Sequence, residues 1–248
     1  MKKLALLFLC LSLLISCEDD ASNVLPNTPP EEESSDWTTL IIPNGREAYA
    51  ITGSIDDTLL VTTWTKAYFT TDRGSTWQES HDFQGPIYDM VRRKDTVFAL
   101  LASGGLKDYI GSPHINDQVY ASIGSKYTTD YGGTWQRNTN RNQHDIISPI
   151  GITISPTGIT YRIKDDITPL NADTTFYRTN HSTVEMYHEG YWQTIDFPFE
   201  YELNNLYVDD DNRLYVSAAT WQYVQDNQIQ EPDENYPGLV YMHKHPLP

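Results

Sequence analysis

Between residues 37 and 248 the chain consists of short runs in which apolar and polar positions alternate. These runs are rich in Val, Ile, Thr and Tyr and are separated by Gly, Asp and Asn. A period of two is typical of β-strands with one buried face, and no long stretch repeats at the helical period. The pattern predicts an all-β domain of four repeated units, each with four strands. The inner strands of the units are expected at residues 47–54, 87–92, 150–154 and 203–208.

One eight-residue segment occurs twice in register with this pattern. Residues 70–77 read TTDRGSTW and residues 128–135 read TTDYGGTW. In a turn of this composition, the Asp side chain can accept backbone N–H groups and Gly can adopt a backbone conformation that other residues avoid. The Trp can fill space between sheets. The positions assigned to this structural turn are Thr70, Asp72, Gly74, Thr76, Trp77, Thr128, Asp130, Gly132, Thr134 and Trp135.

These two segments resemble the Asp-box, or BNR repeat, of sialidase-like β-propellers. The resemblance implies that Asp72 and Asp130 close hairpins between a third and a fourth strand and are not catalytic acids. Trp77 and Trp135 are 58 residues apart, and Trp192 follows after another 57 in a segment that has lost the Asp. The spacing therefore predicts a small propeller with one repeat per blade.

The two ends of the domain predict how the ring closes. The last unit lacks a fourth strand, and an unassigned strand lies around Trp37. If that strand pairs with the C-terminal strand, four blades of four antiparallel strands result, without long unpaired edges. A five-bladed ring with one degenerate blade and a twisted sandwich are the alternatives.

The first residues predict export and lipid attachment. Lys2 and Lys3 precede an apolar run that is too short to span a bilayer and ends at Ser16-Cys17. This order resembles the lipobox of bacterial lipoproteins, which implies cleavage before Cys17 and acylation of that residue. Two or more acyl chains would anchor the protein stably to a membrane. The domains are therefore a signal peptide (1–16), a lipidated and acidic disordered tether (17–36) and the propeller (37–248).

Composition limits the location and the partners further. The acidic run after Cys17 resembles export signals of some Gram-negative outer-membrane lipoproteins, so outer-membrane attachment is expected, with exposure at the cell surface left open. Removal of the signal changes the formal charge from -17 to -19, because Lys2 and Lys3 are lost. Such a chain repels phosphate backbones, so no nucleic-acid partner is expected. We expect a monomer with no cofactor and no metal site.

The expected loops indicate where a binding site would lie. Loops between second and third strands are long in three units, at residues 103–117, 164–174 and 220–238, and all belong to one face of the ring. Long loops without regular structure are often functional. Trp64 and Trp221 both end second strands and are expected to face each other, although such aromatics can also simply pack their own loops. The candidate binding face contains Trp64, Lys66, Tyr109, His114, Arg141, His144, Asp165, Asp166, Phe197, Phe199, Tyr201, Trp221 and Tyr223.

Three functions are compatible with this face. Flat aromatic rings near carboxylates suit a non-catalytic module that binds a glycan or an envelope or extracellular protein, which is the preferred hypothesis. The alternatives are a carbohydrate-active enzyme with paired carboxylates on the same face, and an assembly or scaffold factor. A sialidase is disfavoured, because that chemistry requires an arginine triad and a tyrosine nucleophile with a glutamate partner. No Arg-Ile-Pro type motif precedes Thr70, and no catalytic residue is assigned.

Overall fold

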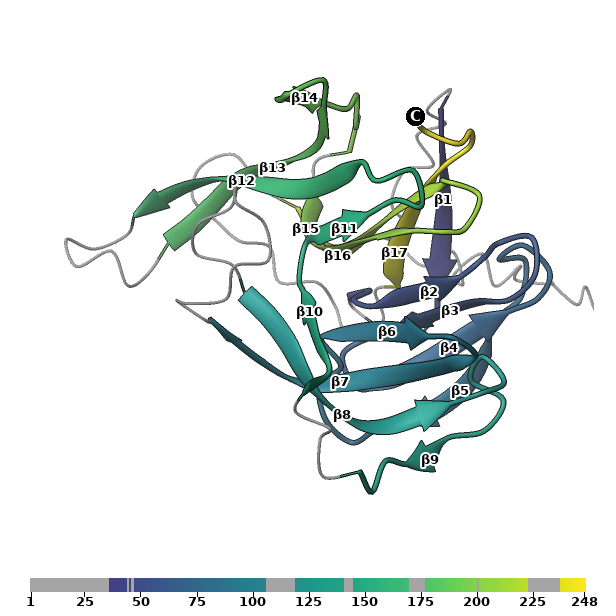
Figure 1. The fold of residues 1–248 in the computed structure, drawn as a ribbon. Helices are drawn as coiled ribbons and strands as arrows, with labels where there is room; N and C mark the ends of the chain where they lie inside the picture. Colours follow the sequence, from purple (N-terminus) through teal and green to yellow (C-terminus); the bar gives the residue numbers. More distant parts are fainter. Residues whose placement is uncertain are drawn as a thin grey trace, which may run out of the picture.

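The structure is a computed structural model that describes residues 36–43, 45, 47–105, 119–140, 145–169, 177–199, 201–222 and 237–248. These residues form β-strands joined by turns and irregular segments, without an α-helix among them. Accordingly, this part of the chain contains no helix with the length and hydropathy needed to cross a bilayer. The strands form four antiparallel sheets, which are arranged as the blades of a β-propeller (Figure 1).

Each blade runs from an inner strand to an outer strand. Blade 1 contains β2 (Ile51–Gly53), β3 (Leu59–Thr62), β4 (Lys66–Thr70) and β5 (Gln78–Asp82). Blade 2 contains β6 (Asp89–Arg93), β7 (Thr96–Gly105) and β8 (Val119–Thr128), with β9 (Gln136–Arg137) and β10 (Ile147–Pro149) along its outer edge. Blade 3 contains β11 (Ile152–Ile154), β12 (Thr160–Pro169), β13 (Tyr177–His188) and β14 (Tyr191–Thr194). Blade 4 contains β15 (Tyr201–Val208), β16 (Leu214–Gln222), β17 (Gly238–His243) and β1 (Trp37–Ile42).

Blade 4 is completed by the first described strand of the chain, which lies beside the last one (Figure 1). β1 pairs with β17 from Trp37, opposite His243, to Ile42, opposite Gly238. Trp37 is buried, and its indole N–H donates to the carbonyl of Asp196 at 2.9 Å. The predicted closure by pairing of the terminal strands is therefore confirmed. The ring has four blades, as predicted, and forms neither the five-bladed ring nor the twisted sandwich.

Apolar side chains fill three of the four boundaries between blades. The clusters include Tyr161, Val184 and Leu203 between blades 3 and 4, Leu59 and Tyr215 between blades 4 and 1, and Leu60 and Met90 between blades 1 and 2. Because both faces of blade 1 are covered, β3 is buried at every position. This explains why Leu59, Leu60 and Val61 are consecutive apolar residues and do not alternate with polar ones.

The boundary between blades 2 and 3 is packed less extensively within the described residues. Its cluster has three buried members, Leu100, Ala121 and Ile146, which all belong to blade 2 or to the segment that follows it. In blade 3, Ile154 of the inner strand β11 is 64% exposed. The ring is therefore asymmetric, with extensive packing at three boundaries and a small cluster at the fourth.

A bend in β8 accounts for the divided outer edge of blade 2. Ile123 has a φ of 64°, a left-handed conformation that β-branched residues rarely adopt. The register of β7 against β8 also shifts between Ala99 and Leu100. β10 pairs with β8 before the bend and β9 pairs with it afterwards. The expectation of one fourth strand near Trp135 therefore missed β10.

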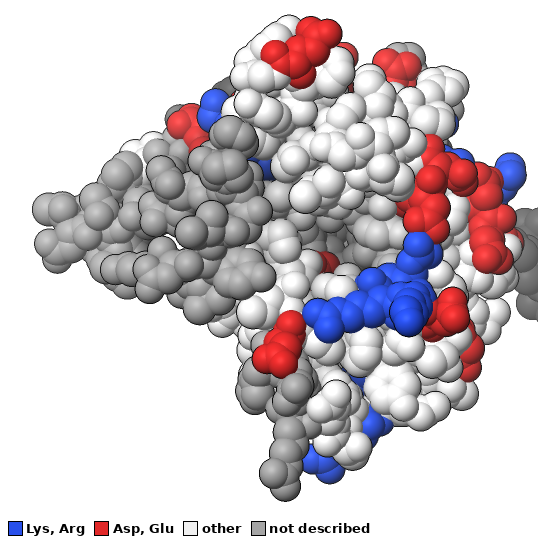
Figure 2. All heavy atoms as spheres, viewed as in Figure 1, with Lys and Arg blue, Asp and Glu red and all other residues white. Residues whose placement is uncertain are grey.

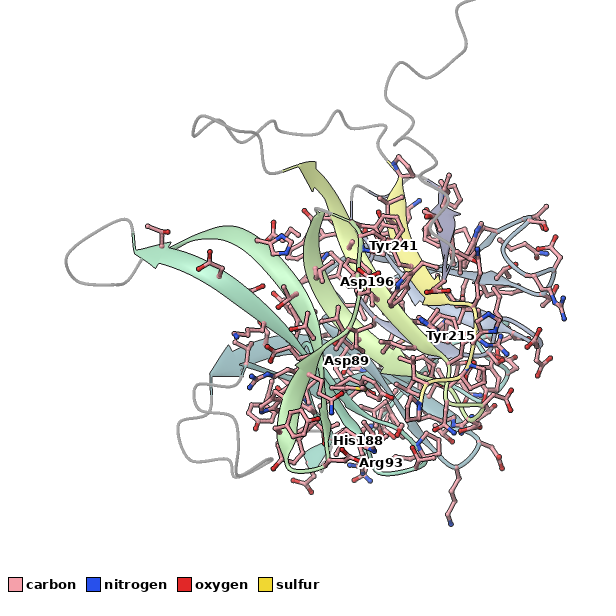
Figure 3. The ribbon with its side chains drawn as sticks, turned by 90° about the horizontal axis from the view of Figure 1, so that it is seen from above. Asp89, Arg93, His188, Asp196, Tyr215 and Tyr241 are labelled. Carbon is pink, nitrogen blue, oxygen red and sulfur yellow. The ribbon has the colours of Figure 1, made fainter. Side chains whose placement is uncertain are left out.

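A network of buried polar groups joins the inner strands near the centre of the ring. The side-chain amide of Asn205 in β15 donates to Asp89 of β6 at 2.9 Å, and its carbonyl accepts the N–H of Gly151 at 2.8 Å. One side chain thus connects blades 4 and 2 with the segment that enters blade 3. Asp89 lies in the middle of the molecule (Figure 3). Burial raises the pKa of Asp89 to about 6, although hydrogen bonds from Ser148, Met90 and Asn205 oppose this shift.

Three second strands are longer than the sequence predicted. β7 continues to Gly105, β12 to Pro169 and β16 to Gln222, into segments that were expected to be loops. Their polar residues resemble loop residues, yet the backbone pairing continues, as between Asp165 and Ser182. The β12–β13 hairpin consequently extends beyond the other strands (Figure 1). The remainder of the expected loops, at 106–118, 170–176 and 223–236, lies outside the described residues.

We predict that Asp89 makes the stability of the ring depend on pH. Its raised pKa means that the folded state favours the protonated form. This contribution is fully present below the ordinary pKa of 3.8 and is lost as the pH rises through about 6. Urea unfolding should show that the wild type loses roughly 2 kcal/mol relative to Asp89→Asn between about pH 4 and pH 7. A constant difference between the two proteins across this range would show that Asp89 does not titrate there.

Candidate functional site

The strand order divides the ends of the blades between two faces. Connections from second to third strands and from each blade to the next meet at one end of the ring, here called the long-loop face. Turns from first to second strands and from third to fourth strands meet at the other end, the short-turn face.

The two repeated turns lie on the short-turn face, where their Asp side chains are fully engaged. The carboxylate of Asp72 accepts the Thr76 N–H at 2.9 Å and the Thr76 hydroxyl at 2.6 Å. Asp130 accepts the same two groups of Thr134, each at 2.8 Å. Hydrogen bonds of this kind lower the pKa of both aspartates, led by the Thr76 hydroxyl at Asp72 and the hydroxyl of Thr128 at Asp130.

The other repeated positions also have local contacts. Gly74 and Gly132 adopt φ values of 82° and 96°, which favour glycine. Trp77 packs against the cluster between blades 4 and 1. Trp135 packs against the cluster between blades 1 and 2, and its indole donates to Ser80 at 2.8 Å. These contacts give the repeated turns a structural role far from the long-loop face.

Acidic and basic side chains are paired on the short-turn face. Arg92 binds Asp210 at 2.6 Å, and Asp56 accepts from both Arg73 and Arg213 at 2.8 and 2.6 Å. In the view of Figure 2, basic side chains form a band bordered by acidic ones. The arginines therefore neutralise carboxylates of neighbouring turns.

The structure describes some of the predicted binding residues with their side chains, others only as backbone, and others not at all. Trp64, Lys66, Asp165 and Asp166 are described with their side chains. Tyr201 and Trp221 are described only as backbone of β15 and β16, so the expected approach of Trp221 to Trp64 lies outside the described side chains. The remaining candidates lie outside the described residues: Tyr109, His114, Arg141, His144 and Tyr223.

Trp64 lies at the centre of an exposed aromatic patch on the long-loop face. Its side chain is 50% exposed. The ring of Tyr49 lies 5.5 Å away at an angle of 54°, and that of Tyr88 lies 6.0 Å away at 80°. The carbonyl of Trp64 accepts the N–H of the fully buried Ile87 at 3.1 Å, which fixes the loop at the junction of blades 1 and 2. Tyr49, Trp64 and Tyr88 are called the aromatic patch below.

Sequence reasoning assigned only Trp64 of these three residues to the face. Tyr49 and Tyr88 fell within the inner strands expected at 47–54 and 87–92, whereas β2 begins at Ile51 and β6 at Asp89. Both tyrosines therefore belong to connections between blades. Their recurrence just before two inner strands was a signal that could have identified them.

Three carboxylates extend the site from the aromatic patch across the ring. The hydroxyl of Tyr49 donates to Glu47, which lies in the connection from blade 4 to blade 1. Loss of surrounding water, followed by the negative charges of Glu47 and Asp165, raises the pKa of Glu202. Asp165 also accepts the hydroxyl of Ser182 at 2.6 Å. Glu47, Glu202 and Asp165 are called the acidic rim, and together with the patch they draw on all four blades.

Other candidates do not join this site. The ammonium group of Lys66 binds Glu79 of β5 at 2.8 Å. The side chains of Phe197 and Phe199, expected on the long-loop face, instead pack in the core between blades 3 and 4. Phe199 is 5% exposed and stacks on Tyr241 with the ring centroids 3.9 Å apart. Their position in a connection indicated exposure, but the apolar cluster buries them.

Tyr49 and Glu47 are hydrogen-bonded to each other, and a tyrosine nucleophile with a glutamate partner is the pair that sialidase chemistry requires. The charge state opposes that chemistry, however. Burial, then the hydrogen bond to Glu47 and nearby negative charges, raise the pKa of Tyr49 far above its ordinary value. A tyrosine nucleophile needs the opposite influence, because its reactive form is the anion. The environment of Tyr49 therefore suits a neutral hydrogen-bond donor.

Metal ligation has no support in the described part of the chain. No group of three or more His, Cys, Asp or Glu residues there is arranged to hold a metal ion. His243 and His245, separated by one residue, interact with each other through the His245 carbonyl at 2.7 Å. The acidic rim thus presents negative charge without the geometry of a metal centre.

Similarity to known proteins is found among solved structures. No model of a protein family and no curated protein matches this chain. Among solved structures, it is similar to YCF48 bound to D1 peptide, with 14% identity over 85% of this chain and 74% of that chain and a TM-score of 0.27. YCF48 from Cyanidioschyzon merolae matches with 11% identity over 85% and 99% of the two chains and a TM-score of 0.33. The N-terminal domain of Nup159 matches with 13% identity over 84% and 85%, at a TM-score of 0.23.

We predict that Glu202→Gln stabilises the folded protein near neutral pH. The raised pKa of Glu202 means that its charged form is less favourable in the folded state than in the unfolded state. The gain should be about 0.5 kcal/mol, on the scale of an exposed charge interaction. It should disappear as the pH falls and Glu202 becomes protonated. Urea unfolding measures the difference, with Glu189→Gln as a control at an exposed turn; equal effects of both variants would contradict the account.

Proposed function

We propose that this chain is a non-catalytic binding module that is anchored to the outer membrane through acylated Cys17. Its ligand, a glycan or an envelope or extracellular protein, would bind at the long-loop face. The observation that carries this proposal is Trp64, which is half exposed although its backbone is fixed between two blades. A large aromatic side chain that is held rigidly in solvent resembles the anchors of binding surfaces.

The anchor and the tether fit this role. Residues 17–36 contain no basic residue and are rich in Glu, Asp and Pro, a composition typical of disordered linkers. Fully extended, such a segment spans at most about 65 Å. The propeller could then reach ligands well away from the lipid surface. Display on the outer cell surface and display in the periplasm both remain compatible with this arrangement.

Binding is preferred over catalysis for a chemical reason. The best candidate for a nucleophile, Tyr49, is held in its neutral form by its surroundings. Among the described residues, the arginines with recorded ion pairs bind carboxylates on the short-turn face or, for Arg162, Glu185 of blade 3. In the described part of the chain, therefore, none of these ion-paired arginines joins the aromatic patch to form the cluster that an acidic sugar would need.

We predict that Trp64→Ala weakens ligand recognition while the fold persists. The full-length protein in neutral detergent would be screened on arrays of glycans and of peptides. A ligand bound by the wild type should bind about 30-fold more weakly to the variant, the effect of losing an anchor worth ~2 kcal/mol.

Tyr191→Ala is the matched control for this screen, since Tyr191 is 56% exposed on the outer strand of blade 3. Thermal unfolding verifies that both variants remain folded. The proposal fails if neither class of ligand binds, or if Tyr191→Ala weakens binding as much as Trp64→Ala does.

We also predict that Cys17→Ser releases the protein from membranes. A serine cannot form the thioether to diacylglycerol, and an acidic chain has little affinity for anionic lipid. Fractionation of expressing cells, with metabolic labelling by a fatty acid, measures the result. Recovery of the unlabelled variant in the membrane fraction would contradict lipid anchoring.

A further inference from the structure

We propose that the aromatic patch and the acidic rim form one docking surface for a cationic segment of a partner protein, with a Lys or Arg side chain against Trp64. This inference rests on the proposed function, because it assigns a ligand chemistry to the same face. It goes beyond that function by selecting a basic protein segment over a glycan.

The three rings are arranged as angled walls. Tyr49 and Tyr88 meet Trp64 at 54° and 80°, so neither forms a parallel stack with the indole. Half of the Trp64 side chain is open to solvent. Cations bind the faces of aromatic rings, and Trp is the best of these partners. Guanidinium groups also stack on aromatic rings through their planar surface.

The neighbouring carboxylates supply the complementary charge. Tyr49 links the patch to the rim, because its hydroxyl donates to Glu47. Glu47 forms a β-bridge with Ala219 of β16, the strand that pairs with the Glu202 strand β15. Loss of surrounding water raises the pKa of Glu202, and the negative charges of Glu47 and Asp165 add to this shift, so both charges repel that of Glu202. A bound cation would relieve this repulsion and interact with a ring at the same time.

Glu202 and Asp165 differ from other acidic residues of the described chain in how their charges are compensated. Asp56, Asp210 and Glu185 each bind an arginine, and Glu79 binds a lysine. No lysine or arginine among the described residues forms an ion pair with Glu202 or Asp165. An external cation is therefore the complementary partner, and a formal chain charge of -17 would attract it over a long range.

Other occupants fit the observations less well. A metal ion would need at least three suitably placed ligands, which the described residues do not provide. A neutral sugar presents donors and acceptors, but the rim offers carboxylate acceptors, and the Tyr49 hydroxyl already donates to Glu47. An anionic sugar would be repelled. A basic side chain, in contrast, can contact the face of an aromatic ring and form an ion pair with a carboxylate at the same time.

Fluorescence anisotropy with short synthetic peptides tests the proposal. The full-length protein in neutral detergent is titrated with Gly-Ser peptides that contain Arg, Lys, Glu or citrulline, the uncharged analogue of Arg. Arg and Lys peptides should bind, and their affinity should fall as salt is added, because charge attraction is screened. Citrulline and Glu peptides should not bind.

Variants show whether binding uses this surface. Trp64→Ala and the double variant Glu202→Gln/Asp165→Asn should each weaken the Arg peptide about tenfold. Trp64→Phe keeps an aromatic ring and should retain part of the affinity for the Arg peptide. This partial retention would show that the loss in Trp64→Ala does not come from misfolding. Glu189→Gln removes one negative charge, half of the change in the double variant, from an exposed turn and should leave the affinity unchanged.

Four outcomes would overturn the proposal. Equal binding of Arg and citrulline peptides would exclude recognition of charge. If Glu189→Gln weakened the Arg peptide as much as the double variant does, the effect would come from the overall charge of the protein and not from this surface. Binding of a glycan that depends on Trp64, without any binding of basic peptides, would refute the partner chemistry and leave the proposed function intact. Absence of binding by every peptide and glycan would refute both.

Discussion

The pairing of β1 with β17 is the interaction on which the rest of the structure depends. It completes blade 4 with a strand from the start of the domain, so the ring closes without a long free edge. It also determines the path of the chain into blade 1, because that connection must cross from the outer edge of blade 4 to an inner strand. Along this path Glu47 pairs with Ala219 and the Ala48 N–H donates to Ala218 at 3.1 Å. The closure therefore holds Glu47 and Tyr49 over blade 4 and beside Trp64.

Polar groups at the centre of the ring complement this closure. Asn205 links blades 4 and 2 and the entry to blade 3, while the hydroxyl of Ser217 donates to the carbonyl of Tyr49 at 2.6 Å. Buried polar networks favour one arrangement of the strands, because any slip would leave their groups unpaired. The apolar cluster between blades 2 and 3 is small, and at this boundary Asn205 connects Asp89 of blade 2 with Gly151 at the entry to blade 3.

Several features could be predicted from the sequence because they repeat. The spacing of Trp77, Trp135 and Trp192 predicted the blades, and the isolated strand at Trp37 predicted the closure. The bend at Ile123 could not be predicted, since it depends on how β10 pairs with β8 and not on a local turn signal.

The binding face was predicted only in outline, because exposure in a connection depends on the neighbouring blade. Trp64 is exposed as expected, but Phe199 in another connection is buried against Tyr241. Asp165 was expected in a loop, and it reaches the acidic rim from a strand because polar residues can continue a hairpin that extends past the core. Glu47 is brought to the blade that carries Glu202 by its pairing with Ala219 of β16, which no linear pattern reveals.

Hydrogen exchange of the full-length protein with and without a saturating Arg-containing peptide tests the central claim most directly. If the aromatic patch and the acidic rim form the binding surface, amide exchange should slow around residues 47–51, 62–66, 86–89 and 201–204. Exchange in the repeated turns at 70–77 and 128–135, on the opposite face, should not change. Protection confined to those turns, or no protection on the long-loop face at saturation, would contradict this account.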